Sequence, residues 1–582
     1  MEARIILSRV KLPGIFSADK LIFLFTTSVV VYLVLPPIAL LILSSFKSTA
    51  DRLPVEPGPL TLSNYVQVLS TGDTYLLFQN SLIYAFSCVV GALAIAILMV
   101  WLTERTDLPG KNLVFTLLLM PIAMPGMVKA IGWTFLANPT NGLINVVSRE
   151  LFGISGGRGP FNIYSLSGMI FVGTLSMMPS LFLMIAGAFR NFDPAFEEAS
   201  EASGVSRSKS QLLITMPLLR PALFGAFIYY LASALDDFQI PAILGLNAGI
   251  RVFSTKIFLA THPDDGLPDY GLASGYGMIL FVTAMILIVL YRRMMRKKQK
   301  YAVVTGKGYR PRLIPLGRWK HVALGSVALY LTLAVVLPVF ILFWISLQPY
   351  VSIPSVEAMG RVTLSNYSEM LAMSHFKEAV INTIVISLIV ATATMFLSTL
   401  TAWMAVRGRF PGHSLPDLLT FINTAVPSVV FALAIAFIYL SFPILPIYGT
   451  IWILVIAYTT RYMSYSTRLM GGAVIQIHQE LEEASQTSGV SRWTTFLRVT
   501  LPLLLPSFFN GWLWVAVHAL RETTIAVMLF TQTNAVVAAL IWEEFQFSGG
   551  TGLVAAMSVC FTVASFILTF LGRRALLRQQ PY

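Results

Sequence analysis

Four charged residues lie inside long apolar runs, where a charge is least expected. Asp236 and Asp237 lie in the run 214–245, and Arg521 and Glu522 lie at the matching positions 285 residues later, in the run 503–531. Charged groups at membrane depth are costly and mark pathways for ions or polar solutes. They predict a translocation path at an interface between two halves. The alternative interpretation is a charge cluster at the outer end of a span, with Arg521 paired to an acid across that interface.

A second set of residues predicts a docking surface. Glu197-Glu198-Ala199-Ser200 precedes Gly204, and Glu482-Glu483-Ala484-Ser485 precedes Gly489 at the same spacing. Nine of the twelve positions from 196 to 207 are identical in the second copy. The glutamates suit the positive end of a short helix, and the glycine permits the left-handed turn that ends it. Two copies of one helix are expected where a dimeric partner offers the same surface twice.

The sequence lacks the motifs of a nucleotide-hydrolysing or metal enzyme. Gly110-Lys111-Asn112 and Gly306-Lys307-Gly308 both lack the Ser or Thr that follows the lysine of a phosphate-binding loop. The two cysteines, Cys88 and Cys560, both lie in apolar runs. No serine triad spacing or histidine cluster occurs. We therefore expect no catalytic residue, no metal site and no cofactor in this chain, and a separate chain as its source of energy.

Composition predicts that helices in a bilayer position these residues. The 582 residues are 56% hydrophobic and 12% charged, with a mean hydropathy of +0.75. A hydrocarbon core about 30 Å thick takes roughly 20 apolar residues per helix, and the runs are too long and continuous for a transmembrane β-barrel. The fold expected is an all-α polytopic membrane protein with twelve transmembrane helices. The runs are approximately 21–46, 79–103, 113–137, 165–189, 214–245, 271–291, 321–347, 379–405, 415–441, 448–470, 503–531 and 551–572.

The chain is an internal duplication. Thr61-Leu62-Ser63-Asn64-Tyr65 recurs as Thr363-Leu364-Ser365-Asn366-Tyr367, an offset of 302. The same offset relates Asn80 to Asn382, Trp101 to Trp403 and Arg105 to Arg407. It falls to 285 at the acidic segments, so the first half holds 17 more residues, which we place between Asn138 and Asn162. Six spans per half make the repeat parallel, with its axis normal to the membrane. The predicted domains are a first half (1–291), a basic linker (292–320) and a second half (321–582).

The charge distribution orients these spans. The net charge of the chain is +13. The segment from Arg292 to Lys320 holds eleven Lys or Arg and no Asp or Glu. Basic short loops mark the cytoplasmic side and attract anionic lipid. No aromatic residues interleave a basic groove, so nucleic acid is not an expected partner. The prediction is a multi-pass protein of the bacterial inner membrane, with both termini in the cytoplasm.

The acidic segments resemble the EAA motif of binding-protein-dependent ABC importer permeases of the type I fold. The resemblance covers both halves and implies two six-helix permease repeats fused in one chain. It also implies a coupling helix in each loop, seated in a cleft of an ATPase subunit. The partners implied are a homodimeric ABC ATPase that binds the ATP, and a periplasmic or lipid-anchored solute-binding protein. The coupling residues implied are Glu197, Glu198, Ala199, Gly204, Glu482, Glu483, Ala484 and Gly489; the second copy departs from the pattern at Gln486 and Thr487.

The substrate is less narrowly indicated. A fused permease of this length, with Thr-Gly-Lys-Gly at 305–308, most resembles the ferric-iron uptake group. Importers of phosphonates, sugar phosphates, polyamines and thiamine are similar to it. Three acids against one arginine at the predicted path favour a cation. An ion-coupled secondary transporter, which can also have twelve spans in two parallel halves, is the alternative class.

Overall fold

The computed structural model describes residues 18–47, 56–190, 195–263, 265, 267–296, 313–408, 411–424, 426–442 and 446–577. Within these ranges the chain is helical, and its only extended pairings are two isolated β-bridges. The expected all-α fold is therefore confirmed. Most of the predicted linker, including the Thr-Gly-Lys-Gly segment, lies outside the described residues.

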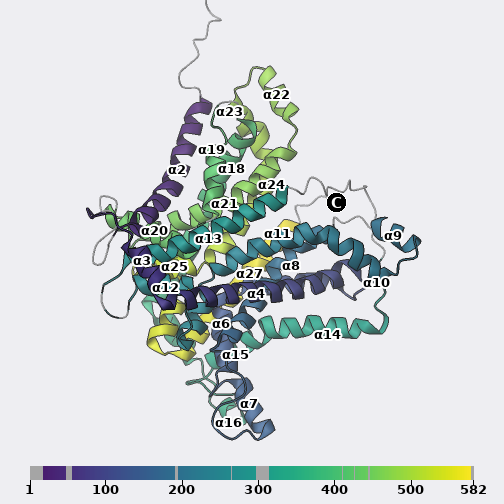
Figure 1. The fold of residues 1–582 in the computed structure, drawn as a ribbon, viewed down its shortest axis with the longest axis vertical. Helices are drawn as coiled ribbons and strands as arrows, with labels where there is room; N and C mark the ends of the chain where they lie inside the picture. The colour runs from purple at the N-terminus through teal and green to yellow at the C-terminus, as the bar shows by residue number, and fades with distance from the viewer. Residues whose placement is uncertain are drawn as a thin grey trace, which may run out of the picture.

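Each half repeats one succession of helices (Figure 1). The first half comprises α2 (Ala18–Ser45), α3 (Ser63–Ser70), α4 (Gly72–Arg105), α5 (Lys111–Leu119), α6 (Gly126–Ala137), α7 (Leu143–Phe152), α8 (Leu166–Arg190), α9 (Ala195–Ala202), α10 (Arg207–Ser210), α11 (Met216–Leu235), α12 (Phe253–Thr261) and α13 (Tyr270–Arg296). The second comprises α14 (Lys320–Leu331), α15 (Leu337–Ser346), α16 (Val356–Met359), α17 (Ser365–Ala372), α18 (Ser374–Arg407), α19 (Leu415–Asn423), α20 (Ser428–Ser441), α21 (Ile451–Gln476), α22 (Gln479–Thr487), α23 (Arg492–Thr495), α24 (Leu501–Leu520), α25 (Thr524–Met528), α26 (Val537–Glu543) and α27 (Thr551–Leu577).

Nine helices in the described residues are long and apolar enough to span a membrane, or twelve spans if each of three bent pairs counts as one. The predicted runs 113–137 and 415–441 are two of these pairs, bent by 90° between α5 and α6 and by 113° between α19 and α20. Each break contains a proline, Pro125 or Pro427, which cannot donate the ladder hydrogen bond of an unbroken helix. The third pair is the short helices η3 (Pro241–Gly245) and η4 (Leu246–Ala248) followed by α12, bent by 80°.

Two predicted runs were too long. The runs 214–245 and 503–531 were expected as continuous spans, but α11 ends at Leu235 and α24 at Leu520. The four charged residues of the predicted path therefore lie in the turns that follow these helices, not within their apolar interiors. The segments that follow these helices offer backbone N–H groups that donate hydrogen bonds to a carboxylate, which favours acidic residues in these turns.

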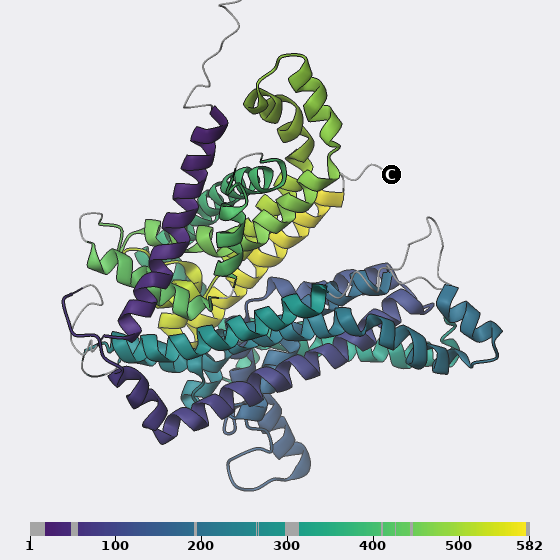
Figure 2. The same ribbon diagram turned by 45° about the horizontal axis from the view of Figure 1, so that its top comes forward.

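The two halves interlock through their first helices. In Figure 2, α2 of the first half lies along the second half, where it packs against α19 and α20. In the same way α15 of the second half packs against α6 of the first. The hydroxyls of Tyr32 on α2 and Tyr439 on α20 are hydrogen-bonded at 2.9 Å. In the other direction, the Tyr330 hydroxyl of α14 donates to the Leu175 carbonyl of α8 at 3.2 Å. Each half thus covers apolar surface of the other.

The ends of the halves that carry α9 and α22 lie well apart in both views (Figures 1 and 2). The loop between α6 and α8 carries α7, whereas α20 and α21 are joined by a much shorter connection. This difference places the extra residues of the first half where the sequence predicts them.

Candidate functional site

The repeated acidic segments form the expected short helices, α9 and α22. Both end at a glycine in the left-handed region, with φ of 83° at Gly204 and at Gly489. A second short helix follows each turn. At the start of α23 the Ser491 hydroxyl accepts a hydrogen bond from the Thr494 backbone N–H at 3.2 Å. Serine is a preferred N-cap residue because its hydroxyl can accept this bond. Each loop is therefore a helix, a tight turn and a helix that leads into the next span.

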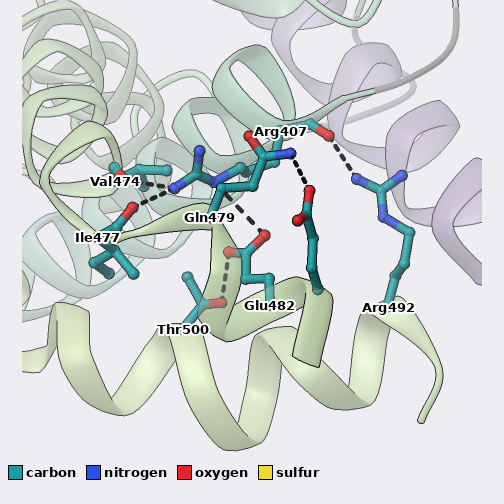
Figure 3. Close-up of polar contacts among 8 residues, drawn as sticks. Arg407, Val474, Ile477, Gln479, Glu482, Arg492 and Thr500 are labelled. Carbon is teal, nitrogen blue, oxygen red and sulfur yellow. Dashed lines mark hydrogen bonds and ion pairs between the residues drawn. The ribbon is translucent and has the colours of Figure 1, made fainter. Parts of the chain in front are cut away.

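The first glutamate of the second loop faces into the protein. Figure 3 shows Glu482 between Arg407 and Thr500. Its Oε2 lies 3.5 Å from Arg407 Nε, and its Oε1 accepts a hydrogen bond from the Thr500 hydroxyl at 2.8 Å. Arg407 Nη2 also donates to the carbonyl of Val474 at 3.2 Å and to that of Ile477. This buried cluster joins α22 to the ends of α18 and α21 and to the start of α24.

The first loop repeats this cluster. Arg105 Nη1 lies 3.8 Å from Glu197 Oε2, and the Thr215 hydroxyl donates to Glu197 Oε1. Arg105 Nη2 donates to the Phe189 carbonyl near the end of α8 at 3.4 Å. The sequence reasoning did not assign Arg105 or Arg407 to the site. The signal was available, because both arginines recur at the offset of 302.

The remaining residues that the sequence predicts for coupling are placed differently. Ala199, Glu483 and Ala484 are exposed, and Glu483 Oε1 accepts a hydrogen bond from Gln479 Nε2 at 2.8 Å. The side chain of Glu198 lies outside the described part of the chain. A polar pocket of about 220 Å³ opens beside α22 and is lined by Val406, Arg407, Gly408, Gln479, Glu482, Glu483, Gln486 and Arg492. Each loop therefore exposes an alanine and anchors one glutamate inward, and the second loop also exposes Glu483.

A cavity of about 770 Å³ lies between the halves. Residues from both halves line it, including Asp236, Arg521 and Glu522 of the predicted path. Asp237 does not line it. Arg461 and Arg468, which the sequence reasoning missed, do. The lining thus has two carboxylates and three guanidinium groups, which reverses the expected balance of three acids against one arginine.

The ion pair across the interface joins Asp236 to Arg461, whereas the alternative interpretation of the sequence had named Arg521. Asp236 Oδ1 accepts a hydrogen bond from the Ser428 backbone N–H at 2.7 Å, and Arg461 Nη2 lies 3.4 Å from Asp236 Oδ2. Arg521 instead donates to His518 Nε2 at 3.0 Å. Among the described residues, Asp236 therefore bonds across the interface to Arg461 and not to Arg521, and the free N–H groups at the start of α20 add to its binding.

The matched acids Asp237 and Glu522 each bond a tyrosine and cap a turn. The Tyr84 hydroxyl donates to Asp237, whose Oδ1 accepts the Gln239 N–H at 3.1 Å. The Tyr462 hydroxyl donates to Glu522 Oε2 at 3.0 Å, and Oε1 accepts an N–H from the following turn at 3.3 Å. Among the described residues no group of three or more His, Cys, Asp or Glu gathers as metal ligands. These acids are held by local hydrogen bonds.

Both halves match one protein family. The model of the family "Binding-protein-dependent transport system inner membrane component" aligns twice, with residues 66–300 and 397–576. The chain belongs to this family. It is a multi-pass inner-membrane permease of the type I ABC importers, with two permease repeats fused in one polypeptide.

Named relatives of this permease differ in how much of it they match. The ferric transport system permease protein FbpB of Actinobacillus pleuropneumoniae is 28% identical over 87% of this chain and 72% of its own length. The Fe(3+)-transport system permease protein FbpB 2 of Haemophilus influenzae is 23% identical over 83% of this chain and 87% of its own. The trehalose/maltose transport system permease protein MalF of Thermococcus litoralis is 25% identical over 46% of this chain and 90% of its own.

Proposed function

We propose that this permease carries ferric iron across the inner membrane, driven by a homodimeric ATPase and supplied by an external solute-binding protein. The observation that supports iron is the extent of the match. The two ferric permeases align with more than four-fifths of this chain, through both halves, whereas the trehalose/maltose permease aligns with less than half.

The ATPase dimer docks on α9 and α22, one helix per subunit, on the cytoplasmic side. The exposed Ala199, Glu483 and Ala484 form the contact, since the two loops offer the same surface twice. ATP is bound by the ATPase, and this chain needs no cofactor. The basic linker and both termini lie on the same side as these loops, as the excess of Lys and Arg indicates.

The cargo passes through the cavity between the halves. Carboxylate and phenol oxygens at Asp236, Glu522 and Tyr462 are hard ligands of the kind that Fe³⁺ prefers. Their existing hydrogen bonds and the ion pair to Arg461 limit how tightly they hold a cation, which suits a path that must release it.

One observation favours a second candidate. The guanidinium groups of Arg461, Arg468 and Arg521 line the same cavity, and guanidinium is the side chain best matched to phosphate. A phosphonate or sugar phosphate is therefore the alternative cargo.

Reconstitution distinguishes the two proposed cargoes. The permease is placed in proteoliposomes with the ATPase and binding protein encoded beside it, and ATP-dependent uptake of ferric iron is compared with that of a phosphonate, a sugar phosphate, a polyamine and thiamine. Iron uptake that stops with a hydrolysis-deficient ATPase supports the proposal. Uptake of another solute instead of iron would refute the iron assignment. Ion-driven uptake by the permease alone would establish the secondary transporter and refute the ATPase partner.

A further inference from the structure

We propose that Arg105 and Arg407 are positioning residues that lock each coupling helix to a single rigid helix, α4 or α18, whose far end holds the outer seal of the cavity. The inference rests on the proposed docking of an ATPase on α9 and α22, and it deepens that function by naming how movement at the loops reaches the other side of the membrane.

The inner ends are joined by the two buried clusters. Arg407 closes α18 and binds Glu482 of α22, and Arg105 closes α4 and binds Glu197 of α9. The arginine side chains are 5% and 11% exposed, and those of the glutamates 11% and 7%. Breaking a pair this buried leaves an uncompensated charge, so the two groups separate far less readily than a surface pair. A displacement of the coupling helix must therefore move the end of α4 or α18 with it.

The outer ends of the same helices are joined to a second pair of short helices. On α4, Asn80 Nδ2 donates to the Arg251 carbonyl at 3.4 Å, and the Ser81 hydroxyl accepts the Phe253 N–H at 3.0 Å. These bonds fix the start of α12 to α4.

The second half repeats the arrangement at the matching residues. On α18, Asn382 Nδ2 donates to the Ala535 carbonyl at 3.0 Å, and the Thr383 hydroxyl accepts the Val537 N–H at 3.0 Å. These bonds fix the start of α26 to α18. Asn80 and Asn382, like Arg105 and Arg407, recur at the offset of 302, so the repeat preserves both ends of this helix.

The helices α12 and α26 meet across the interface between the halves. The rings of Phe258 and Trp542 pack edge to face with centroids 5.9 Å apart, and Phe238 packs on both, at 5.2 Å and 5.7 Å. We call Phe238, Phe258 and Trp542 the outer plug. Phe238 is 1% exposed and Trp542 6%, so these two rings are shielded from solvent.

The helices α4 and α18 are suited to transmit a movement from one end to the other. From Ser81 to Arg105 an α-helix rising 1.5 Å per residue covers about 36 Å without a break. A proline is absent from both α4 and α18, whereas the neighbouring spans α8, α11 and α24 each contain at least one. Closure of the ATPase would draw α9 and α22 together, pivot α4 and α18, and separate α12 from α26.

The test reports on the plug itself. Cysteines replace Leu267 and Phe547, exposed residues that follow α12 and α26, in a chain whose Cys88 and Cys560 are changed to alanine. Both cysteines are spin-labelled, and their separation is measured in the full complex with a hydrolysis-deficient ATPase, with and without ATP. The parent complex should show a second, ATP-dependent distance.

Arg407→Ala should bind the ATPase yet lower the equilibrium constant for the ATP-dependent state about tenfold, equivalent to about 1.4 kcal/mol of coupling. Arg190→Ala is the matched control: this exposed arginine ends the neighbouring α8 and pairs with Glu104 at 2.8 Å, and its loss should leave the shift unchanged. The swap Arg407→Glu with Glu482→Arg should restore the shift, which separates a positioning role from a loss of folding.

A full shift in Arg407→Ala, or a swap that folds but does not recover the shift, would overturn the proposal. A parent complex that binds no ATPase, or that shows no response to ATP, would instead refute the function on which it rests. Variants are first compared by thermal unfolding. If Arg407→Ala does not fold, the swap alone decides the outcome.

Discussion

Asp236 of the first half caps α20 of the second, accepting the Ser428 N–H at 2.7 Å. The same carboxylate lies 3.4 Å from Arg461 on α21, so one side chain joins two helices of the opposite half at the wall of the cavity. Its matched residue in the repeat is Arg521, which cannot cap a helix N-terminus. The cavity is therefore electrostatically unequal on its two sides despite the duplication.

Asp236→Ala should destabilise the permease more than Asp236→Asn. Alanine removes the cap and leaves Arg461 unpaired, a loss of about 3 kcal/mol, whereas asparagine keeps an acceptor for Ser428 and loses the ion pair alone. Thermal unfolding in detergent measures the difference. Asp417→Asn, at the more exposed pair with Arg468, is the control and should cost less than about 1 kcal/mol. Equal effects of the two Asp236 variants would contradict the capping role.

Gly489→Ala should distort the second coupling loop. Its φ of 83° costs an alanine about 1 to 2 kcal/mol, although nothing within 4 Å would meet the new methyl group. The expected result is weaker binding of the ATPase, measured by co-purification, with membrane insertion intact. Gly472→Ala in the exposed face of α21 also meets no atom but has an ordinary helical φ, and there alanine should be neutral or stabilising. Equal binding by both variants would argue against the loop as the docking element.

The two adjacent glutamates of the second loop should fail in different ways. Glu483 is exposed, so Glu483→Lys should weaken association with the ATPase. Glu482 is buried against Arg407 and Thr500, so Glu482→Gln should leave association nearly intact while lowering both stability and ATP-driven transport. Co-purification, thermal unfolding and uptake together distinguish the outcomes. The assignment fails if Glu482→Gln abolishes association while Glu483→Lys does not.

Gly132→Ala should loosen the contact between α6 and α15. A methyl group there would lie 2.9 Å from Pro338 Cβ and 3.1 Å from its Cα, closer than packed atoms allow. We expect a loss of about 1 to 3 kcal/mol, because one half must shift away from the other. Gly325→Ala in α14, where no atom lies within 4 Å, provides the control. A Gly132→Ala protein as stable as the parent would show that the two helices separate at little cost.

The sequence by itself determined the class of fold, the duplication, and the two short acidic helices with their glycine turns. These features depend on local chemistry. Apolar run length sets the need for a membrane span, and the left-handed turn at Gly204 and Gly489 requires a residue without a side chain. The repeat also pointed to these loops as a functional site, because a loop that keeps its sequence in two copies stands out from apolar spans that have diverged.

Only the tertiary structure decided which charged groups meet. Arg105 and Glu197 lie on separate helices, and no spacing rule relates them until α4, α8 and α9 pack together. The structure likewise paired Asp236 with Arg461 and not with Arg521, because the break at Pro427 turned the free N–H groups and α21 toward that carboxylate. A charge in a low-dielectric interior takes the nearest partner that the packing supplies, and that partner is set by the packing of distant segments and not by position in the sequence.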